Sequence, residues 1–181
     1  RLDKDTSGLL VVAKTLEVQT DLVRQLQART VKRQYLALAL GRVERDGSVD
    51  APIGRHPVQR VKMAVVRGGK DARTHYQVVE RFERVILLEC RLETGRTHQI
   101  RVHLGHIGHP LLGDAVYGPH FKTKAGHLGP KGKQALTALG RQALHAYLLA
   151  LEHPRTVEFL HWEAGLPKDL LLLQGALEAA V

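Results

Sequence analysis

The apolar residues of the chain fall into short continuous runs and into segments with helical spacing. Short apolar runs bounded by Gly, Ser, Thr or charged residues are typical of strands. Such runs lie at 8–14, 32–40, 74–81, 84–92, 141–151 and 157–162, and the first, rich in valine, is predicted to be a buried strand. Most of the strands are joined by short turns, which favours antiparallel pairing.

Helical spacing marks three further segments. Residues 16–29 place Leu22, Val23 and Leu26 on one face, and Thr15 precedes them as an N-cap. A second helix is predicted from Thr97, which could cap it, to about 108–110, with apolar residues at 100, 104 and 107. A C-terminal helix is predicted at 170–180.

The segment 122–133 has little periodicity. It contains four Lys and three Gly, and we therefore predict an exposed basic loop. The chain shows no internal repeat and no convincing linker. Together the elements predict a single α+β domain spanning residues 1–181.

Composition narrows the class of protein. With 181 residues, 44% of them hydrophobic, the chain is long enough to bury one core. Cys90 is the only cysteine, so no disulfide can form within the chain, which favours a reducing compartment. No apolar run approaches the ~18 residues of a membrane span. We therefore expect a cytoplasmic protein that does not enter the membrane.

The charge of the chain is strongly positive and unevenly spread. The net charge is +9, and between Thr94 and Leu151 the only acidic residue is Asp114. That window holds seven of the eleven His residues together with Arg96, Arg101, Lys122, Lys124, Lys131, Lys133 and Arg141. A surface of one sign is typical of proteins that grip a phosphate backbone, whereas few aromatic residues are available for stacking on bases. The pattern favours a structured RNA as partner over an anionic membrane.

Two sequence blocks carry the candidate chemistry. The first is Arg-Leu-Asp-Lys-Asp-Thr-Ser-Gly-Leu at 1–9, and the second is Gly-Arg-Thr-His-Gln-Ile-Arg-Val-His at 95–103. Taken alone, Asp3 and Asp5 are as expected for turn or capping residues with solvated carboxylates. The two blocks together, with the turn and apolar run after the first, point instead to one active site.

These blocks resemble the motifs of the RluA family of pseudouridine synthases, most closely the RluD branch that modifies large-subunit ribosomal RNA. The similarity runs from Arg1 to about Asp169 and includes 52–57, 63–65, 74–76, 109–114, 117–118 and 141–146. It implies a pseudouridine synthase fold, in which a mixed, mostly antiparallel sheet carries helices and loops on its flanks. It also implies isomerisation of specific uridines in RNA, without a cofactor.

The resemblance assigns three catalytic residues. Asp3 matches the nucleophile that attacks a flipped nucleoside, and Arg101 matches the arginine that keeps this carboxylate charged. At ~4 Å and an effective dielectric near 20 such a pair gains roughly 4 kcal/mol before desolvation. Tyr35 matches a tyrosine that lies against the target base and assists proton removal. By residue type alone, Tyr35 is better explained as a core aromatic, and only its position in the motif favours the catalytic role.

Further basic and polar residues are predicted to bind RNA. Arg1 matches an arginine that fills the place of the flipped uridine. Residues 96, 98 and 99 open the predicted helix, where they either bind phosphate or simply cap the helix. Residues 55, 60 and 62 lie in a loop that is either near RNA or merely solvated. The predicted RNA-binding set is Arg1, Arg55, Arg60, Lys62, Arg96, His98, Gln99 and Arg141.

Other interpretations are less well supported. His103, His106 and His109 repeat every three residues, but no carboxylate or thiol stands near in sequence, so we expect no metal site. A glycosidase would need a second catalytic acid, for which only Asp5 is available. A non-catalytic RNA-binding or ribosome assembly factor with the same fold is the main alternative.

The family pattern also indicates what surrounds this chain. Its members have a histidine before the residue matching Arg1, a preceding stretch of the catalytic fold, and an S4-type RNA-binding domain. We therefore expect residues 1–181 to be a catalytic domain lacking its N-terminal part. We further expect a monomer whose target is a 23S rRNA stem-loop, with tRNA as the alternative.

Overall fold

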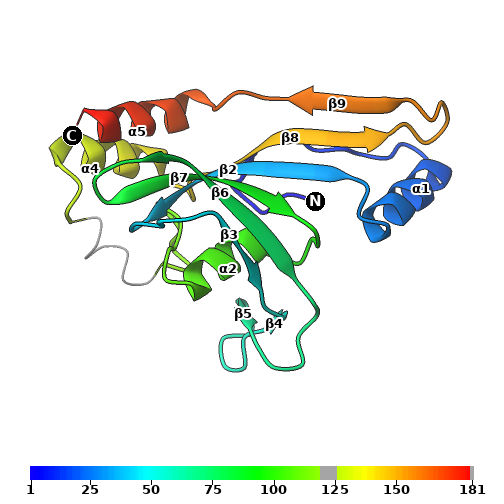
Figure 1. The fold of residues 1–181 in the computed structure, drawn as a ribbon, viewed down its shortest axis with the longest axis horizontal. Helices are drawn as coiled ribbons and strands as arrows, with labels where there is room; N and C mark the ends of the chain where they lie inside the picture. The colour runs from blue at the N-terminus through cyan, green and yellow to red at the C-terminus, as the bar shows by residue number, and fades with distance from the viewer. Residues whose placement is uncertain (119–125, 180–181) are drawn as a thin grey trace.

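A seven-stranded sheet is the main element of the computed structural model, which describes residues 1–118 and 126–179 (Figure 1). The strand order is β1-β8-β2-β7-β6-β3, and β9 pairs with β8. Only β1 and β8 pair in parallel. The mixed, mostly antiparallel sheet predicted from the sequence is thus confirmed. The strands are β1 (Ser7–Gly8), β2 (Lys32–Leu40), β3 (Gly47–Asp50), β6 (Arg73–Arg81), β7 (Val85–Leu92), β8 (Leu144–Glu152) and β9 (Phe159–Glu163).

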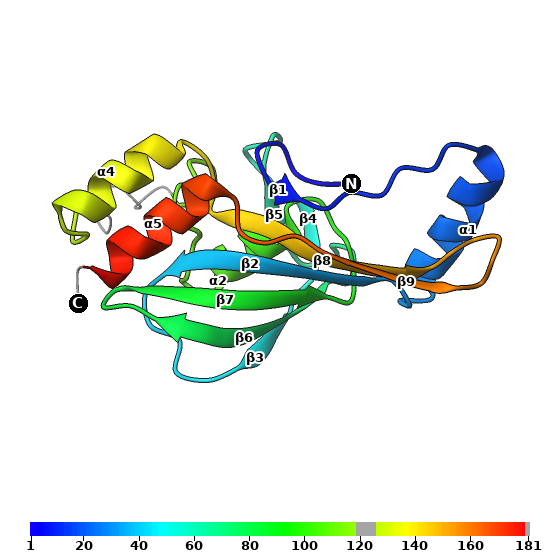
Figure 2. The ribbon, with the colours of Figure 1, turned by 90° about the horizontal axis from the view of Figure 1, so that it is seen from above.

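Within the described ranges, four helices and one hairpin surround the sheet. Helix α2 (Gln99–His106) lies beneath it in Figure 1, next to the hairpin of β4 (Ile53–Arg55) and β5 (Met63–Val65). Helices α4 (Pro130–Leu139) and α5 (Lys168–Glu178) pack together at one end, and α1 (Leu16–Gln27) lies at the other (Figure 2). No helix within the described ranges is both long enough and apolar enough to cross a membrane.

Strand β2 is covered on both faces, which explains its nearly continuous apolar sequence. Its residues Tyr35, Ala37 and Ala39 belong to a core that includes Ile100 and Leu104 of α2. The alternate residues Leu38 and Leu40 belong to a second core with α4 and α5. Because strand side chains alternate between faces, one strand joins both cores. Tyr35 therefore starts the row that faces α2.

Helix α1 begins as predicted, since Thr15 Oγ1 accepts a hydrogen bond from the Val18 amide at 3.3 Å. The predicted apolar face is only partly buried. Leu22 is buried, whereas Val23 is 44% and Leu26 39% exposed. The helix is held instead by Gln25, whose amide pairs with the backbone of Glu152 at the end of β8.

Two sequence predictions were wrong. The run 8–14 is not a buried strand: pairing stops at Gly8, and Leu10 and Val12 are 55% and 74% exposed. The reason is that β9 pairs with residues 148–152 of β8, and so occupies the edge of β8 along which this run could have continued. Residues 130–133 of the predicted basic loop belong to α4, where Pro130 opens the helix and Leu136 and Leu139 bury one face. Residues 122–125 lie outside the described part of the chain.

Other differences concern boundaries. Helix α2 starts at Gln99, with His98 and not Thr97 as its N-cap. β8 starts at Leu144, because residues 141–143 form the approach to the strand. The short strands β3, β4 and β5 were not predicted, since three or four residues carry too little pattern to be recognised.

Candidate active site

The loop that carries Asp3 is a tight turn fixed by its backbone. The Thr6 amide donates to the Asp3 carbonyl at 3.1 Å, and Asp5 has a left-handed φ of 68°. Gly8 has a φ of 115°, and a Cβ there would clash with the backbone of Ala146. Only glycine permits this close approach of the two backbones. The first block of the sequence therefore brings Asp3 beside the start of β8.

Arg141 and Gln142, which precede β8, hold the Asp3 loop through its backbone carbonyls. Arg141 Nη1 donates to the Asp5 carbonyl at 3.1 Å, and Gln142 Nε2 donates to the Lys4 carbonyl at 2.6 Å. The Arg141 guanidinium also forms two hydrogen bonds to Asp169, at 2.9 and 3.1 Å. Predicted as an RNA contact, Arg141 is thus occupied by internal partners, and its position supports the Asp3 loop.

Arg101 joins the two sequence blocks. Its Nη1 lies 3.6 Å from Asp3 Oδ2, although 98 positions separate the residues in the sequence. Its closer partner is Asp114, which accepts from Nε at 2.7 Å and from Nη2 at 3.1 Å. The side chain of Asp114 is wholly buried, and that of Arg101 is 7% exposed. Asp114 therefore fixes the plane of the guanidinium and leaves Nη1 directed at Asp3.

The surroundings of Arg101 keep it charged. Burial alone would lower the pKa of Arg101, but its hydrogen bonds and charge pairing with Asp114, and the charge of Asp3, outweigh burial and raise the pKa. The guanidinium also lies 4.9 Å from the ring centroid of Tyr117. Arg101 therefore places a permanent cation beside the Asp3 carboxylate.

Tyr117 links the site to the β4–β5 hairpin. Its hydroxyl lies 2.6 Å from His98 Nδ1 and accepts a hydrogen bond from the Met63 amide at 3.0 Å. A neutral imidazole can accept a hydrogen bond from this hydroxyl at Nδ1. Burial lowers the pKa of His98, although the charge of Asp3 opposes the shift. His98 caps α2 with its backbone alone, and its ring is turned into the site.

Asp3 opens onto a cavity of about 180 Å³. Asp3 and Tyr35 line it from two sides, and Arg1, Arg33 and Arg96 add positive charge. Among the described residues, no second carboxylate lines this cavity, which argues against the two-acid chemistry of a glycosidase. The cavity is thus a positively charged cleft with one acid at its wall.

Tyr35 enters this cleft at an irregularity of the sheet. Tyr35 pairs with Ala146 and Gln34 with Leu148, so Tyr147 of β8 has no partner on β2. Such bulges redirect neighbouring side chains and are common beside active sites. Burial raises the pKa of Tyr35, Arg33 opposes the shift, and Asp3 adds to it. Its hydroxyl is therefore a neutral phenol at physiological pH.

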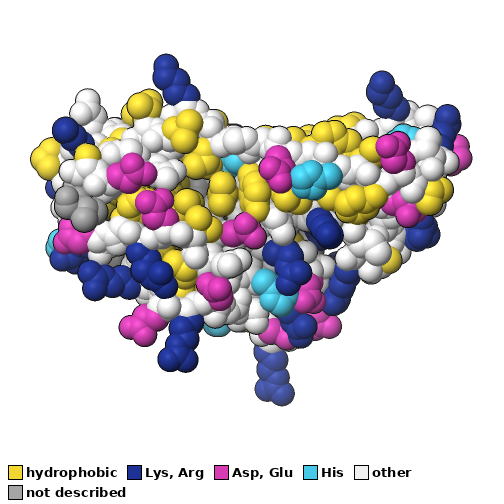
Figure 3. Space-filling model, turned by 45° about the horizontal axis from the view of Figure 1, so that its top comes forward, with side chains coloured by type: hydrophobic (Ala, Val, Ile, Leu, Met, Phe, Trp, Pro, Cys, Tyr) yellow, Lys and Arg dark blue, Asp and Glu magenta, His cyan; other side chains and the backbone are white. Residues whose placement is uncertain are grey.

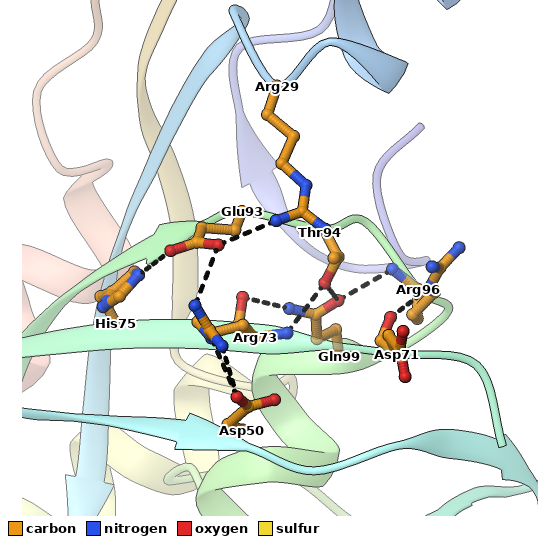
Figure 4. Close-up of polar contacts among 9 residues, drawn as sticks. All are labelled: Arg29, Asp50, Asp71, Arg73, His75, Glu93, Thr94, Arg96 and Gln99. Carbon is orange, nitrogen blue, oxygen red and sulfur yellow. Dashed lines mark hydrogen bonds and ion pairs between the residues drawn. The ribbon is translucent and has the colours of Figure 1, made fainter. Parts of the chain in front are cut away.

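Gln99 connects the second block to the sheet and does not face solvent (Figure 4). Its Oε1 accepts from the Thr94 hydroxyl and the Arg96 amide, at 2.7 and 3.0 Å. Its Nε2 donates to Thr74 Oγ1 and to the Arg73 carbonyl, at 2.9 and 3.0 Å. Because both the oxygen and the nitrogen of its side-chain amide are fully hydrogen-bonded, Gln99 shapes the 94–96 turn and has no free group for RNA.

The histidines noted in the sequence have separate partners. His103 is fully buried, with Nε2 donating to the Ala51 carbonyl at 2.8 Å and Nδ1 accepting from Thr74 at 2.9 Å. His109 Nδ1 donates to the Leu40 carbonyl at 2.9 Å. Within residues 1–118 and 126–179, no three His, Cys, Asp or Glu side chains gather as metal ligands.

The remaining predicted RNA contacts lie around the cleft or away from it. Arg1 and Arg96 line the cavity, whereas Arg55, Arg60 and Lys62 belong to the hairpin and the loop at its tip. The Met63–Tyr117 hydrogen bond ties this hairpin to the site, and Met63 and Val65 also pack in a cluster with Val102 of α2. Another face differs in character: Figure 3 shows hydrophobic side chains across its upper part, over α5 and β9, where Phe159, Trp162, Leu171 and Leu172 are exposed.

Sequence reasoning missed three residues of the site: Arg33, Asp114 and Gln142. Asp114 carried a signal, because it is the only acid in the long basic window and so the natural partner for a buried arginine. Arg33 stands two positions before Tyr35, on the same side of β2. Nothing in the sequence distinguished Gln142.

The comparisons with known proteins agree with this geometry. The family described as RNA pseudouridylate synthase matches residues 1–106. The ribosomal large subunit pseudouridine synthase D of Nitrosomonas europaea is 61% identical over 98% of the chain, and that of Pseudomonas aeruginosa 55% over 96%. The chain covers 50% and 54% of these two relatives, and so spans about half their length. The solved human RNA pseudouridylate synthase domain containing 4 is 27% identical, with a TM-score of 0.77, over 98% of this chain and 74% of that chain.

Proposed function

Because the chain belongs to the RNA pseudouridylate synthase family, we propose that it isomerises specific uridines to pseudouridine in RNA, with Asp3 as nucleophile. The observation that carries the proposal is the ion pair between Asp3 and Arg101 at the wall of a positively charged cleft. A nucleophilic carboxylate reacts in its charged form, and a fixed cation next to a carboxylate favours that form in general.

The reaction needs only groups that this cleft supplies. Attack by Asp3 on a flipped nucleoside breaks the bond between ribose and N1 of uracil. The ring then turns and is rejoined through C5, and the proton on C5 is replaced by one on N1. No atom is gained or lost, so no cofactor is required. Tyr35 lines the same cleft, and its role in this proposal is a proton relay, in which its oxygen accepts the proton from C5 while its own hydroxyl proton passes to N1.

The substrate that we propose is large-subunit ribosomal RNA, at a 23S stem-loop. This rests on the names of the relatives and on the positive charge of the cleft. Arg1, Arg96 and the hairpin residues 55, 60 and 62 supply positive charge for the RNA backbone. A tRNA substrate, a cytoplasmic location, a monomeric state, and a missing N-terminal part with an S4-type domain stay predictions.

The test is the Asp3→Asn variant, assayed by mapping pseudouridine in an unmodified 23S rRNA transcript. We expect modification to vanish while RNA binding and thermal stability persist, since Asn has the shape of Asp but cannot act as the nucleophile. Asp5→Asn is the matched control, because Asp5 lies exposed in the same turn and Asn tolerates its positive φ.

Two outcomes would count against the proposal. Continued modification by Asp3→Asn would show that another group is the nucleophile. A wild-type chain that binds RNA but modifies no uridine in ribosomal RNA or tRNA would favour the non-catalytic assembly factor. Equal loss in the two variants would show that the turn, and not the carboxylate of Asp3, was disturbed.

A further inference from the structure

Arg33 is a largely buried arginine without a protein partner. Its Nε is fully buried and makes no hydrogen bond, and no ion pair of its guanidinium exists within the described residues. Arg101 and Arg141 provide the contrast, since each is similarly enclosed and each forms two hydrogen bonds to an aspartate. Burial lowers the pKa of Arg33, which reflects the cost of this environment.

Arg33 lines two neighbouring hollows of the surface. One is the cleft of Asp3 and Tyr35, and the other lies outside it, between α1 and the 93–96 turn. Gly95 packs directly against the guanidinium, where a Cβ would clash with Nη1. Arg96 lines both hollows as well. Two arginines thus border the passage between the cleft and the surface.

The neighbouring acids are already engaged. Asp3 faces Arg101 at 3.6 Å. Glu93 contacts Arg29, Arg73 and His75 (Figure 4), and these hydrogen bonds and charges lower the pKa of its carboxyl. Among the residues that the structure describes, the Arg96 side chain donates only through Nε, to the Asp71 carbonyl at 2.8 Å. An uncompensated buried cation is costly, so an anion from outside the chain is expected to complete the site.

We propose that Arg33, assisted by Arg96, binds a backbone phosphate of the RNA next to the uridine held in the cleft. The planar fork of a guanidinium matches two phosphate oxygens, and the passage beside Gly95 connects the cleft to the surface along which the strand would leave. The identity of the anion as an RNA phosphate rests on the proposed function. Arg33 is then a binding residue and not part of the chemistry.

The experiment compares Arg33→Met with Arg45→Met. Arg45 is exposed in the loop beyond the other end of β2, so both variants lose one positive charge. With an unmodified 23S rRNA transcript, we expect Arg33→Met to weaken binding roughly 10- to 100-fold, as for loss of a charged hydrogen bond. The slope of log affinity against log salt should become shallower by about 0.7 to 0.9. Arg45→Met should bind as the wild type does.

The melting temperature and the single-turnover rate distinguish a binding role of Arg33 from a structural or catalytic role. Methionine removes an unpaired buried charge while keeping most of the volume, so the melting temperature of Arg33→Met should be unchanged or higher. The single-turnover rate at saturating RNA should stay within about threefold of wild type. Arg33→Lys should recover the salt slope but only part of the affinity, because lysine lacks the fork.

Three results would overturn the inference. One is unchanged RNA affinity in Arg33→Met, and a second is a marked loss of stability, which would indicate a structural role. The third is a rate at saturating RNA lowered more than about tenfold, which would show that Arg33 acts on Tyr35 or Asp3. A wild-type chain without activity would refute the proposed function alone, because the affinity comparison does not depend on turnover.

Discussion

Replacing Asp114 by Asn should damage the site without touching any residue of the cleft. Asp114 Oδ1 accepts from Arg101 Nη2 and from the amides of Val116 and Tyr117, while Oδ2 accepts from Arg101 Nε. An asparagine has one oxygen, and placing it at the Oδ1 position satisfies three of these donors. Its NH₂ group then faces the Nε–H of Arg101, donor against donor.

The magnitude follows from the burial of this pair. The side chain of Asp114 is wholly buried and that of Arg101 is 7% exposed. Removing one partner of such a pair costs about 3–5 kcal/mol, because it leaves the other charge uncompensated. For a chain of this size the cost corresponds to a fall in melting temperature of roughly 6–20 °C. Arg101 also loses the two bonds that direct Nη1 at Asp3, so modification should fall more than about 100-fold.

The assay is thermal unfolding together with single-turnover formation of pseudouridine at saturating 23S rRNA transcript. Asp169→Asn is the control, because Asp169 also pairs with an arginine, Arg141, but its side chain is 41% exposed. Solvent screening should limit that cost to about 1 kcal/mol. If Asp114→Asn lowers stability no more than the control does, or leaves the rate at saturating RNA intact, Asp114 does not position Arg101 and the reasoning is refuted.

Two further predictions concern the backbone and the pH dependence of stability. Gly8→Ala should lower the melting temperature and reduce modification more than about tenfold, because a Cβ clashes with the backbone of Ala146 and displaces the Asp3 turn; wild-type activity in this variant would contradict the role of the turn. Burial lowers the pKa of His103 below its ordinary 6.5, so His103 supports folding above that pH and loses its contribution as pH falls through its folded pKa. The stability difference between wild type and His103→Gln should therefore shrink in denaturant unfolding between pH 7 and 5, and a constant difference would contradict it.

The elements that could be predicted from the sequence are those with a strong local pattern. Strand β2 has the predicted limits 32–40, because both of its faces are buried and its apolar run is nearly continuous. Helix α1 begins at its predicted cap, since Thr15 acts through the local hydrogen bond to Val18. The run 9–13 has the same composition as a strand, but β9 pairs with the edge of β8 along which it would continue. Competition from a segment about 150 positions away is not visible in the local pattern.

The candidate site also has features that could be predicted from the sequence and features that could not. The resemblance indicated that Asp3 and Arg101 belong together, and the structure places them 3.6 Å apart. It did not indicate that Arg101 is held mainly by Asp114, or that the Arg141 side chain pairs with Asp169. These partners depend on tertiary contacts across 13 and 28 positions of sequence, which no periodicity encodes.

The support of the Asp3 turn by residues before β8 has a consequence for the order of events during synthesis. The stabilising contacts join positions 134 to 138 residues apart. A chain emerging from the ribosome would have already completed α2 and presented Arg101 while Asp3 was still unanchored. The pairing of Asp3 with Arg101 therefore becomes fixed late, only after residue 145 has left the exit tunnel. A truncated translation product ending before that point would carry both sequence motifs and yet lack the contacts that hold the Asp3 turn.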